Sequence, residues 1–382
     1  MENYAGFVVT REDVFWSLKS KHYKDIIEEN NLKETDVSNN VALVRIAFIP
    51  PRDDFQLPVN RWTYKVDQDI LPVWYDAVTV ESRCRAKLEE WCKAKVVLPE
   101  KVIDTIKENH IVAIYGTVNH IKGSAIVDYI GGSARIGSIG DSVTVNHIWD
   151  SATVSYIKGL VKVEYIGSSA KVGYIGGPAT VESIRGSATV DCIGDSTRVN
   201  YIADSATVES IKGSAKVDSI CNSAKVYFIL ESATVNSIRD SAKVNCIRGS
   251  AKVYFINGSA GVKTILDSSK VDSIEGSAKV GSISGSTEVK SISESAKVDF
   301  IGSSSKVKSI SGFAIINFIS GFATVESIDD SVTVYCINGS ARVHSIRDSV
   351  RIESIKDSVR VDYIGSSAKV YSISGSAIVE SV

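Results

Sequence analysis

The stretch SATVESIKGSAKVDSI, residues 205–220, contains one nine-residue pattern twice, Ser-Ala-x-Val-x-x-Ile. From Gly123 the chain divides into 28 such units and a last unit of eight residues, without insertion or deletion through Val382. Position 5 of the unit is always Val or Ile, and position 8 is Ile in every unit but the last. Such constant spacing is typical of a repeat architecture.

The apolar spacing within the unit favours a strand. Positions 3, 5 and 8 carry small or apolar residues, and the resulting intervals of two, three and four residues do not follow a helical period. β-Branched residues at alternate sites, followed by Gly, Asp, Asn or Ser, are typical of a short strand and a turn. Because one unit can bury its small apolar face only against copies of itself, the sequence predicts a mainly β fold, a β-solenoid.

The length of one coil is not fixed by a single unit, and two or three units per coil both fit the pattern. Sorting by three separates residue types, whereas sorting by two does not, so we predict three nine-residue units per 27-residue coil. A degenerate unit at residues 114–122 brings the total to about ten coils. The alternative is that the 27-residue period records duplication history. When every third unit is taken together, one of the three resulting sets carries mostly acids at position 6, including Glu164, Asp191, Asp218, Asp272 and Asp299. Another set carries mostly rings at position 7, including His120, His147, Tyr174, Tyr201, Phe228 and Phe255.

Charge narrows the choice of partner. Residues 123–382 contain 26 basic and 26 acidic side chains, so the repeat region is neutral. We expect basic side chains at position 4, such as Lys216 and Lys243, to neutralise the neighbouring acidic column in a solvated ladder. A nucleic-acid binder is expected to carry a basic stripe, and a DNA mimic an acidic surface. The prediction is therefore a protein partner, with no nucleic acid and no membrane.

The N-terminal region differs in composition from the repeats. Four of the five Trp and five of the six Pro lie before residue 100. We predict an α+β capping or interaction domain at residues 1–109 and the β-solenoid at 110–382. Within the first domain we expect a helix starting after Thr10 and Asp13, a strand at 41–49, a long helix capped by Asp76, and a short helix at 100–109.

The segment RWTYKVDQDILPVWYD, residues 61–76, contains the pattern W-x-x-x-V-D-Q-D-x-x-P-x-W-Y. It resembles a segment of uncharacterised proteins of gut bacteria and their phages, which precedes short-repeat solenoids there. The resemblance extends from Trp62 to about Val97. It implies an N-terminal domain followed by a solenoid, in a bacterial or phage setting, and it implies no activity.

The same segment supplies the candidate site of the N-terminal domain. Asp67 and Asp69 lie one residue apart, close to Asp76 and to Trp74. Such acids can bind a cation or act as an acid pair. The structural alternative, which we favour, is that they are turn-forming and capping acids beside a Trp-rich core.

Other chemical motifs are absent from the sequence. There is no phosphate-binding glycine loop, no H-E-x-x-H and no G-x-S-x-G. His120 and His147 occur in the same TVNHI sequence and would stack one coil apart, but no third metal ligand has a suitable spacing. The aromatic column is interpreted as corner packing, with a sugar or nucleobase platform as the alternative. We therefore predict no catalytic residue, no cofactor and no metal.

Two features of the repeats are candidate partner-binding surfaces. Phe313 and Phe322 replace the usual Ser at position 2, and Ile315 replaces an outward polar residue, so together they predict an exposed apolar patch. Val382 ends the last unit, and we expect this last coil to pair with a second copy or a dedicated partner.

Two classes of function follow from these observations. We favour a non-enzymatic structural or protein-interaction solenoid, and the alternative is an enzyme or ligand-binding protein that uses the region of Asp67 and Asp69, or an acyltransferase built on a β-helix. The N-terminus lacks the pattern of a secretory signal, and six irregularly spaced Cys fit reduced thiols. A soluble cytoplasmic protein is therefore expected.

Overall fold

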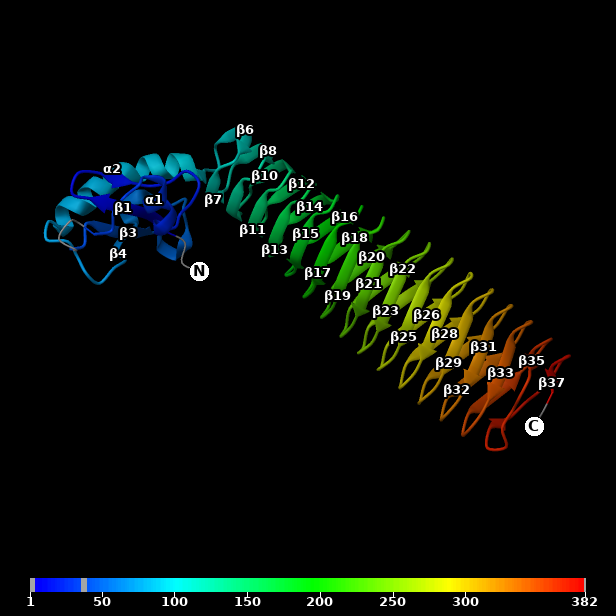
Figure 1. The fold of residues 1–382 in the computed structure, drawn as a ribbon. Coiled ribbons are helices and arrows are strands. Elements are labelled where there is room, and N and C mark those ends of the chain that lie inside the picture. The colour runs from blue at the N-terminus through cyan, green and yellow to red at the C-terminus, as the bar shows by residue number, and fades with distance from the viewer. Residues whose placement is uncertain (1–3, 36–39, 381–382) are drawn as a thin grey trace. The chain divides into compact units, whose positions relative to one another are not determined.

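The computed structural model describes residues 4–35 and 40–380. The chain is mainly β, with few helices and a β-solenoid of about 16 turns (Figure 1). It divides into two compact units, Met1–Val154 with Val161–Val163, and Ser155–Leu160 with Glu164–Val382. Strands β12 (Thr153–Ile157) and β13 (Lys162–Ile166) each contain a boundary between these units.

The first unit begins with a four-stranded antiparallel sheet in the order β2-β1-β3-β4. Two helices accompany this sheet, and the predicted strand at 41–49 and the predicted long helix are confirmed as β3 and α2. Asp76 caps α2, because its carboxylate accepts a hydrogen bond of 2.8 Å from the Thr79 N–H. The elements are β1 (Ala5–Thr10), β2 (Val14–Phe15), α1 (Tyr23–Glu29), β3 (Leu43–Ile49), the 3₁₀ turns η1 (Pro51–Asp53) and η2 (Val59–Arg61), β4 (Thr63–Val66) and α2 (Ala77–Lys95).

One predicted helix of this region begins later than expected, and the helix predicted at residues 100–109 is wrong. Thr10 Oγ1 does accept a hydrogen bond of 3.0 Å from the Asp13 N–H, but the turn joins β1 to β2, and helix α1 begins later, at Tyr23. Residues 100–109 contain strand β6 (Val102–Lys107), which pairs in parallel with β8 (Thr117–Lys122). The β-branched residues of this segment therefore follow the neighbouring strand, and strand pairing of the solenoid type begins before residue 110.

The first coils share a core with the N-terminal sheet. Trp62 and Trp91 are fully buried together with Val112, Ala113 and Tyr115 in one apolar cluster. One parallel ladder contains β6, β8 and β10, and the other contains β5, β7, β9 and β11. The remaining bounds are β5 (Val96–Val97), β7 (His110–Ile114), β9 (Ile126–Ile130), β10 (Arg135–Ile139) and β11 (Thr144–Ile148).

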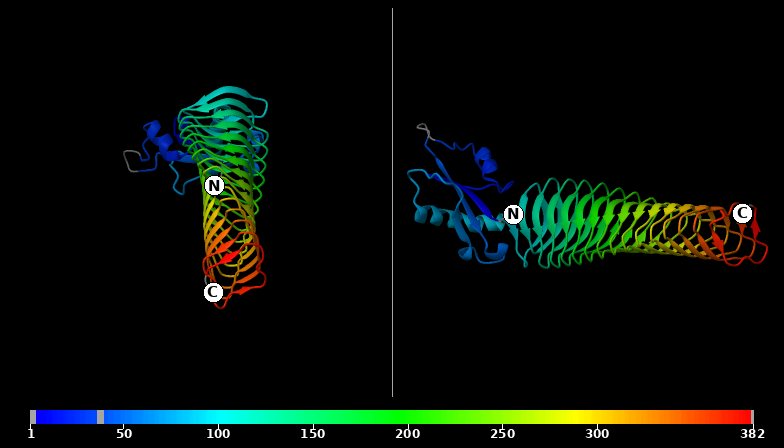
Figure 2. Two further views of the ribbon diagram at one scale, coloured as in Figure 1. Left: turned by 90° about the vertical axis from the view of Figure 1, so that its right-hand side faces the viewer. Right: turned by 90° about the horizontal axis from the view of Figure 1, so that it is seen from below.

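The second unit consists of two parallel ladders, whose strands lie side by side in Figures 1 and 2. The even sheet contains β14 (Lys171–Ile175), β16 (Thr189–Ile193), β18 (Thr207–Ile211), β20 (Lys225–Ile229), β22 (Lys243–Ile247), β24 (Gly261–Ile265), β26 (Lys279–Ile283), β28 (Lys297–Ile301), β30 (Ile315–Ile319), β32 (Thr333–Ile337), β34 (Arg351–Ile355) and β36 (Lys369–Val370). The odd sheet contains β15 (Thr180–Ile184), β17 (Arg198–Ile202), β19 (Lys216–Ile220), β21 (Thr234–Ile238), β23 (Lys252–Ile256), β25 (Lys270–Ile274), β27 (Glu288–Ile292), β29 (Lys306–Ile310), β31 (Thr324–Ile328), β33 (Arg342–Ile346), β35 (Arg360–Val361) and β37 (Ile378–Val379).

The register shows that the predicted three-unit coil is wrong. Val217 pairs with Val235, two repeat units later, and the same two-unit offset recurs through both ladders. One coil is therefore two nine-residue units, and the structure has about 16 turns where about ten were predicted. Residues three units apart, such as Tyr174 in β14 and Tyr201 in β17, lie on different sheets. The 27-residue period in composition is not the coil length.

Each unit ends in a tight turn that returns the chain to the other sheet. From Gly123 to Asp357 the first residue of every unit has a positive φ, which favours Gly and tolerates Asp and Asn. At Gly213, φ is +67°, and a Cβ there would lie 2.8 Å from the Asp195 nitrogen. Where this residue is acidic, its carboxylate accepts a hydrogen bond from the turn one coil earlier, as Asp195 does from the Gly177 N–H at 2.8 Å.

The solenoid core contains the residues at positions 3, 5 and 8. Val217, for example, is 1% exposed, and this confirms its predicted inward position. Where a hydroxyl replaces Ala at position 3, it donates to a backbone carbonyl, which belongs to the preceding coil for Thr197 and to the same turn for Ser269, Thr287 and Ser305. The distances are 2.6 Å for Ser269 to Leu266 and 2.6 Å for Thr287 to Ser284. The core therefore contains these polar groups without leaving them unsatisfied.

Candidate functional site

Asp67 and Asp69 follow strand β4, and both side chains are exposed. The residue between them holds this loop: the Gln68 side chain accepts from the Arg45 N–H at 2.8 Å and donates to the Leu43 carbonyl at 3.0 Å. Burial, and next the nearby Asp67 carboxylate, raise the pKa of Tyr23. No group of three His, Cys, Asp or Glu that could hold a metal is found among residues 4–35 and 40–380. The Gln68 side chain thus hydrogen-bonds to the backbone of β3 beyond the end of β4, a role that was not predicted from the sequence.

Trp74 has a structural position. It is half-buried and packs against the apolar cluster that contains Trp62 and Trp91. Beside it, the Tyr75 and Tyr64 hydroxyls lie 3.1 Å apart. Trp74 thus belongs to the wall of the core, whereas Asp67 and Asp69 are exposed to solvent.

A buried cluster of charged groups lies in the first unit, around Asp128 of strand β9. Its Oδ2 atom lies 2.8 Å from Lys21 Nζ and 3.0 Å from His110 Nε2, and its Oδ1 accepts from Asn146 Nδ2 at 3.0 Å. Burial alone would raise the pKa of Asp128, but the interactions with His110 and Lys21 lower it by more than burial raises it. The pKa of Asp128 therefore lies below its ordinary value. Asp128 occupies an outward repeat position, and no sequence signal indicates that this position is covered.

Lys95, the last residue of α2, is fully buried close to this cluster. Its Nζ donates to the Leu18 carbonyl at 2.6 Å, and the His110 N–H donates to the same oxygen at 3.0 Å. Burial lowers the pKa of Lys95 to about 8, and the charge of Asp128 opposes this shift. Together these contacts tie the N-terminal segment to the first coils.

A surface hollow of about 320 Å³ lies beside Tyr129 and Asp150. The Tyr129 hydroxyl donates to Asp150 Oδ2 at 2.6 Å, and the Gly132 N–H donates to the same oxygen at 2.8 Å. Burial and this hydrogen bond raise the pKa of Tyr129. The Asp150 carboxylate therefore accepts the same backbone hydrogen bond as the other acidic turn residues of the solenoid. This structural role explains the position of Asp150 beside the hollow.

The two histidines of the TVNHI sequences do not stack. His120 lies in β8, where its Nδ1 is 2.9 Å from the Ser138 Oγ, and His147 lies in β11, opposite Tyr129. Because β8 and β11 belong to different ladders, the predicted stacking of these side chains one coil apart is wrong. The same correction applies to the whole predicted aromatic column, whose members alternate between the two sheets.

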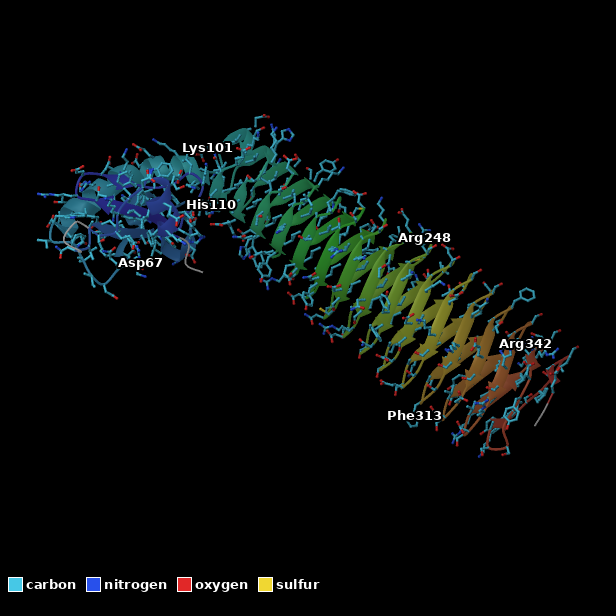
Figure 3. All side chains as sticks on the ribbon, in the orientation of Figure 1. Asp67, Lys101, His110, Arg248, Phe313 and Arg342 are labelled. Carbon is cyan, nitrogen blue, oxygen red and sulfur yellow. The ribbon has the colours of Figure 1, made fainter. Side chains whose placement is uncertain are left out.

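The predicted apolar patch is exposed but divided. Phe313 and Phe322 are 70% and 71% exposed, and Ile315 is half-buried. Phe313 projects at the edge of the strand stack (Figure 3), in the turn before β30, whereas Phe322 lies in the turn after it. Consecutive turns lie at opposite ends of a strand, so the two rings are not brought together. Val382, the fourth predicted partner residue, lies outside the described residues.

Only a small part of the predicted charge ladder forms: two cross-strand lysine ion pairs lie on the odd sheet, whereas Lys216, Lys252, Lys306 and Lys308 of that sheet form none within the described residues. On the odd sheet, Lys270 Nζ lies 2.7 Å from Glu288 Oε2, and Lys290 Nζ lies 2.8 Å from Asp272 Oδ1. Both pairs join neighbouring strands of the ladder, β25 and β27. On the even sheet from β14 to β36, no strand lysine forms an ion pair with any residue in the described part of the chain.

Comparisons with known proteins give no relative. No protein-family model, no curated protein and no solved structure matches this chain. Among the described residues, no helix is both long enough and apolar enough to cross a membrane.

Proposed function

We propose that this chain is a non-enzymatic interaction scaffold, a solenoid of nine-residue repeats whose outward side chains bind a protein partner. The observation that carries this proposal is the contrast between the two faces of each strand. Inward positions 5 and 8 repeat Val and Ile throughout, whereas outward positions 4 and 6 change between Lys, Thr, Glu, Asp, Asn and Tyr from strand to strand. Packing constrains the inward set, and the outward set is free to carry recognition.

The N-terminal domain is proposed to cap the first coil. Support comes from the apolar cluster in which Trp62, Trp91, Val112 and Tyr115 are buried together, and from the ion pair between Lys21 and Asp128. Solenoids need such end structures, since an open ladder exposes unpaired backbone groups and core side chains. The six free cysteines suit a reducing cytoplasm, and the segment at 61–76 favours a bacterial or phage setting.

The enzyme alternative receives less support. Asp67 and Asp69 are exposed, and neither lines the hollow beside Tyr129 and Asp150. Catalytic carboxylates are usually found in a pocket that shifts their pKa and excludes water. The exposed loop held by Gln68 lacks that setting.

Site-specific photo-crosslinking tests the scaffold proposal. A benzophenone amino acid placed at Phe313 or at Tyr335, which is 50% exposed, is expected to capture a discrete protein from an extract of the source organism. The same residue placed at the buried Tyr115 serves as the matched control and should capture nothing. Absence of a discrete adduct at both outward positions would contradict the proposal.

A further inference from the structure

Five exposed lysines form a row on the outward face of the even sheet. They come from five consecutive strands, β20, β22, β24, β26 and β28, and the two-unit register places two pairs directly opposite one another. Neighbouring strands lie about 4.8 Å apart, so the row extends over about 19 Å. This lysine row consists of Lys225, Lys243, Lys263, Lys279 and Lys297.

The charge of the lysine row is not neutralised by its own strands. Positions 4 and 6 of these five strands include a single acid, Asp299. Its Oδ1 accepts from Asn317 Nδ2 at 3.0 Å, on the side away from most of the row. None of the five lysines forms an ion pair with a residue in 4–35 or 40–380.

The acids of the neighbouring turns are occupied by hydrogen bonds. Glu275, at position 9 before β26, accepts from Ser273 Oγ at 2.9 Å. Each acid at position 1 accepts a hydrogen bond from a backbone N–H of the turn one coil earlier, as the Asp195 carboxylate does. These bonds hold the carboxylates at the ends of the strands, away from positions 4 and 6. The four are Glu231 to Gly213 at 2.9 Å, Asp240 to Asn222 at 3.1 Å, Asp267 to Gly249 at 3.0 Å and Glu294 to Gly276 at 2.8 Å.

The neutral composition of the repeats therefore hides a segregation of charge. At the same repeat positions on the odd sheet, Lys270 and Lys290 are paired with acids, whereas Lys216, Lys252, Lys306 and Lys308 form no ion pair in the described part of the chain; what sets the lysine row apart is its run over five consecutive strands. Like charges placed opposite one another destabilise a sheet, and an anionic ligand removes that repulsion. The lysine row is thus a surface whose complement is a chain of regularly spaced negative charges.

Aromatic side chains favour one class of polyanion. Tyr227, next to Lys225 on the same face of β20, is 39% exposed. At the other end of the row, Phe300 is 36% exposed and pairs across the strands with Phe318. Exposed rings beside cationic side chains are the combination that binds single-stranded nucleic acids, whose bases stack on the rings while phosphates contact the lysines.

We propose that the lysine row binds single-stranded nucleic acid, with phosphates at the lysines and bases stacked on Tyr227 and Phe300. The centre of the row is open, because a Cβ at Gly261 would meet no atom within 4 Å. From its neutral composition the solenoid was expected not to bind nucleic acid. That expectation assumes that charge is spread evenly over the surface, whereas the two-unit register brings five lysines together on neighbouring strands. This binding surface stands independently of the protein-scaffold proposal.

Fluorescence anisotropy of a labelled oligothymidine tests the proposal on the full chain. Binding should weaken with salt, with a log–log slope of about 3.5 for five phosphate contacts, and the double variant Lys243→Gln/Lys279→Gln should lower the slope to about 2. The control Lys270→Gln/Lys290→Gln removes two lysines at repeat positions 4 and 6 on the odd sheet and should leave the slope unchanged. Tyr227→Ser should weaken binding at least about fivefold.

Several results would overturn the proposal. Equal loss in the two double variants would show a nonspecific effect of net charge, and no binding at low salt would remove the surface altogether. Heparin or polyglutamate binding more tightly than the oligonucleotide, with no effect of Tyr227→Ser, would assign the lysine row to another class of polyanion. Circular dichroism and melting of each variant establish that the fold is intact before binding is compared.

Discussion

The two-unit register predicts which pair of engineered cysteines can form a disulfide. Thr189 in β16 lies directly opposite Thr207 in β18, whereas Thr180 in β15 lies three repeat units before Thr207. Neighbouring strands place the first pair of Cα atoms about 4.8 Å apart, within the range that a disulfide spans. The second pair projects from two different sheets. Closing the two-unit loop should stabilise the chain by about 3 kcal/mol.

The assay compares two variants in a background from which the six native cysteines have been removed. Thr189→Cys/Thr207→Cys should lose both free thiols on mild oxidation and melt at a higher temperature than its reduced form. Thr180→Cys/Thr207→Cys, which has the same residue type at the same repeat position, should keep both thiols. Rapid oxidation of this three-unit pair, with free thiols left in the two-unit pair, would refute the two-strand coil.

Three further predictions concern stability. Val217→Asp should lower the free energy of unfolding by more than about 3 kcal/mol, since it removes an apolar side chain and buries an unpaired charge. The control Lys216→Asp changes an outward residue and should melt like the parent. Equal melting temperatures of the two variants would contradict the inward assignment of Val217. Asp195→Ala should cost about 2 kcal/mol and speed exchange of the Gly177 amide, whereas Asp195→Asn keeps the acceptor and should cost less. A hydrogen bond from the Gly177 N–H is the largest influence lowering the pKa of Asp195, so the stability difference between the parent and the Ala variant should shrink toward that of the Asn variant as pH falls through the lowered pKa; a difference that does not change with pH would contradict a charge-assisted bond. Burial holds the pKa of Lys95 at about 8, below its ordinary 10.5, so the unfolded chain binds more protons than the folded chain between these two pH values. The free energy of unfolding of the parent should therefore rise by up to about 3 kcal/mol from pH 8 to 10.5, relative to that of Lys95→Met. Identical pH profiles of the two proteins would show that Lys95 titrates normally.

The candidate site could be predicted only in part. Exposure of Phe313 and Phe322 followed from their replacement of a turn Ser, because side chains at a tight turn point to solvent. Their separation did not follow, because it depends on how many units complete a coil. The cluster around Asp128 could not have been predicted at all, since Lys21 and Asp128 are more than a hundred residues apart and only the docking of the first coils brings them together.

The sequence by itself determined the unit of this fold. The alternation of Val and Ile with polar residues, the small residue at position 3 and the Gly or Asp of the turn specify a five-residue strand, its inward face and its tight turn, because these depend on residues close together in the chain. The helix capped by Asp76 is equally local, and the structure confirms it.

Only the tertiary structure decided how the units assemble. Every unit has nearly the same inward face, so a strand can stack equally well on the second or the third unit along the chain as far as its own pattern is concerned. The choice is made by the chain reversal at each turn, which sends successive units to opposite sheets. That choice sets which outward side chains are neighbours: it pairs Lys270 with Glu288, and it leaves Lys225 facing Lys243.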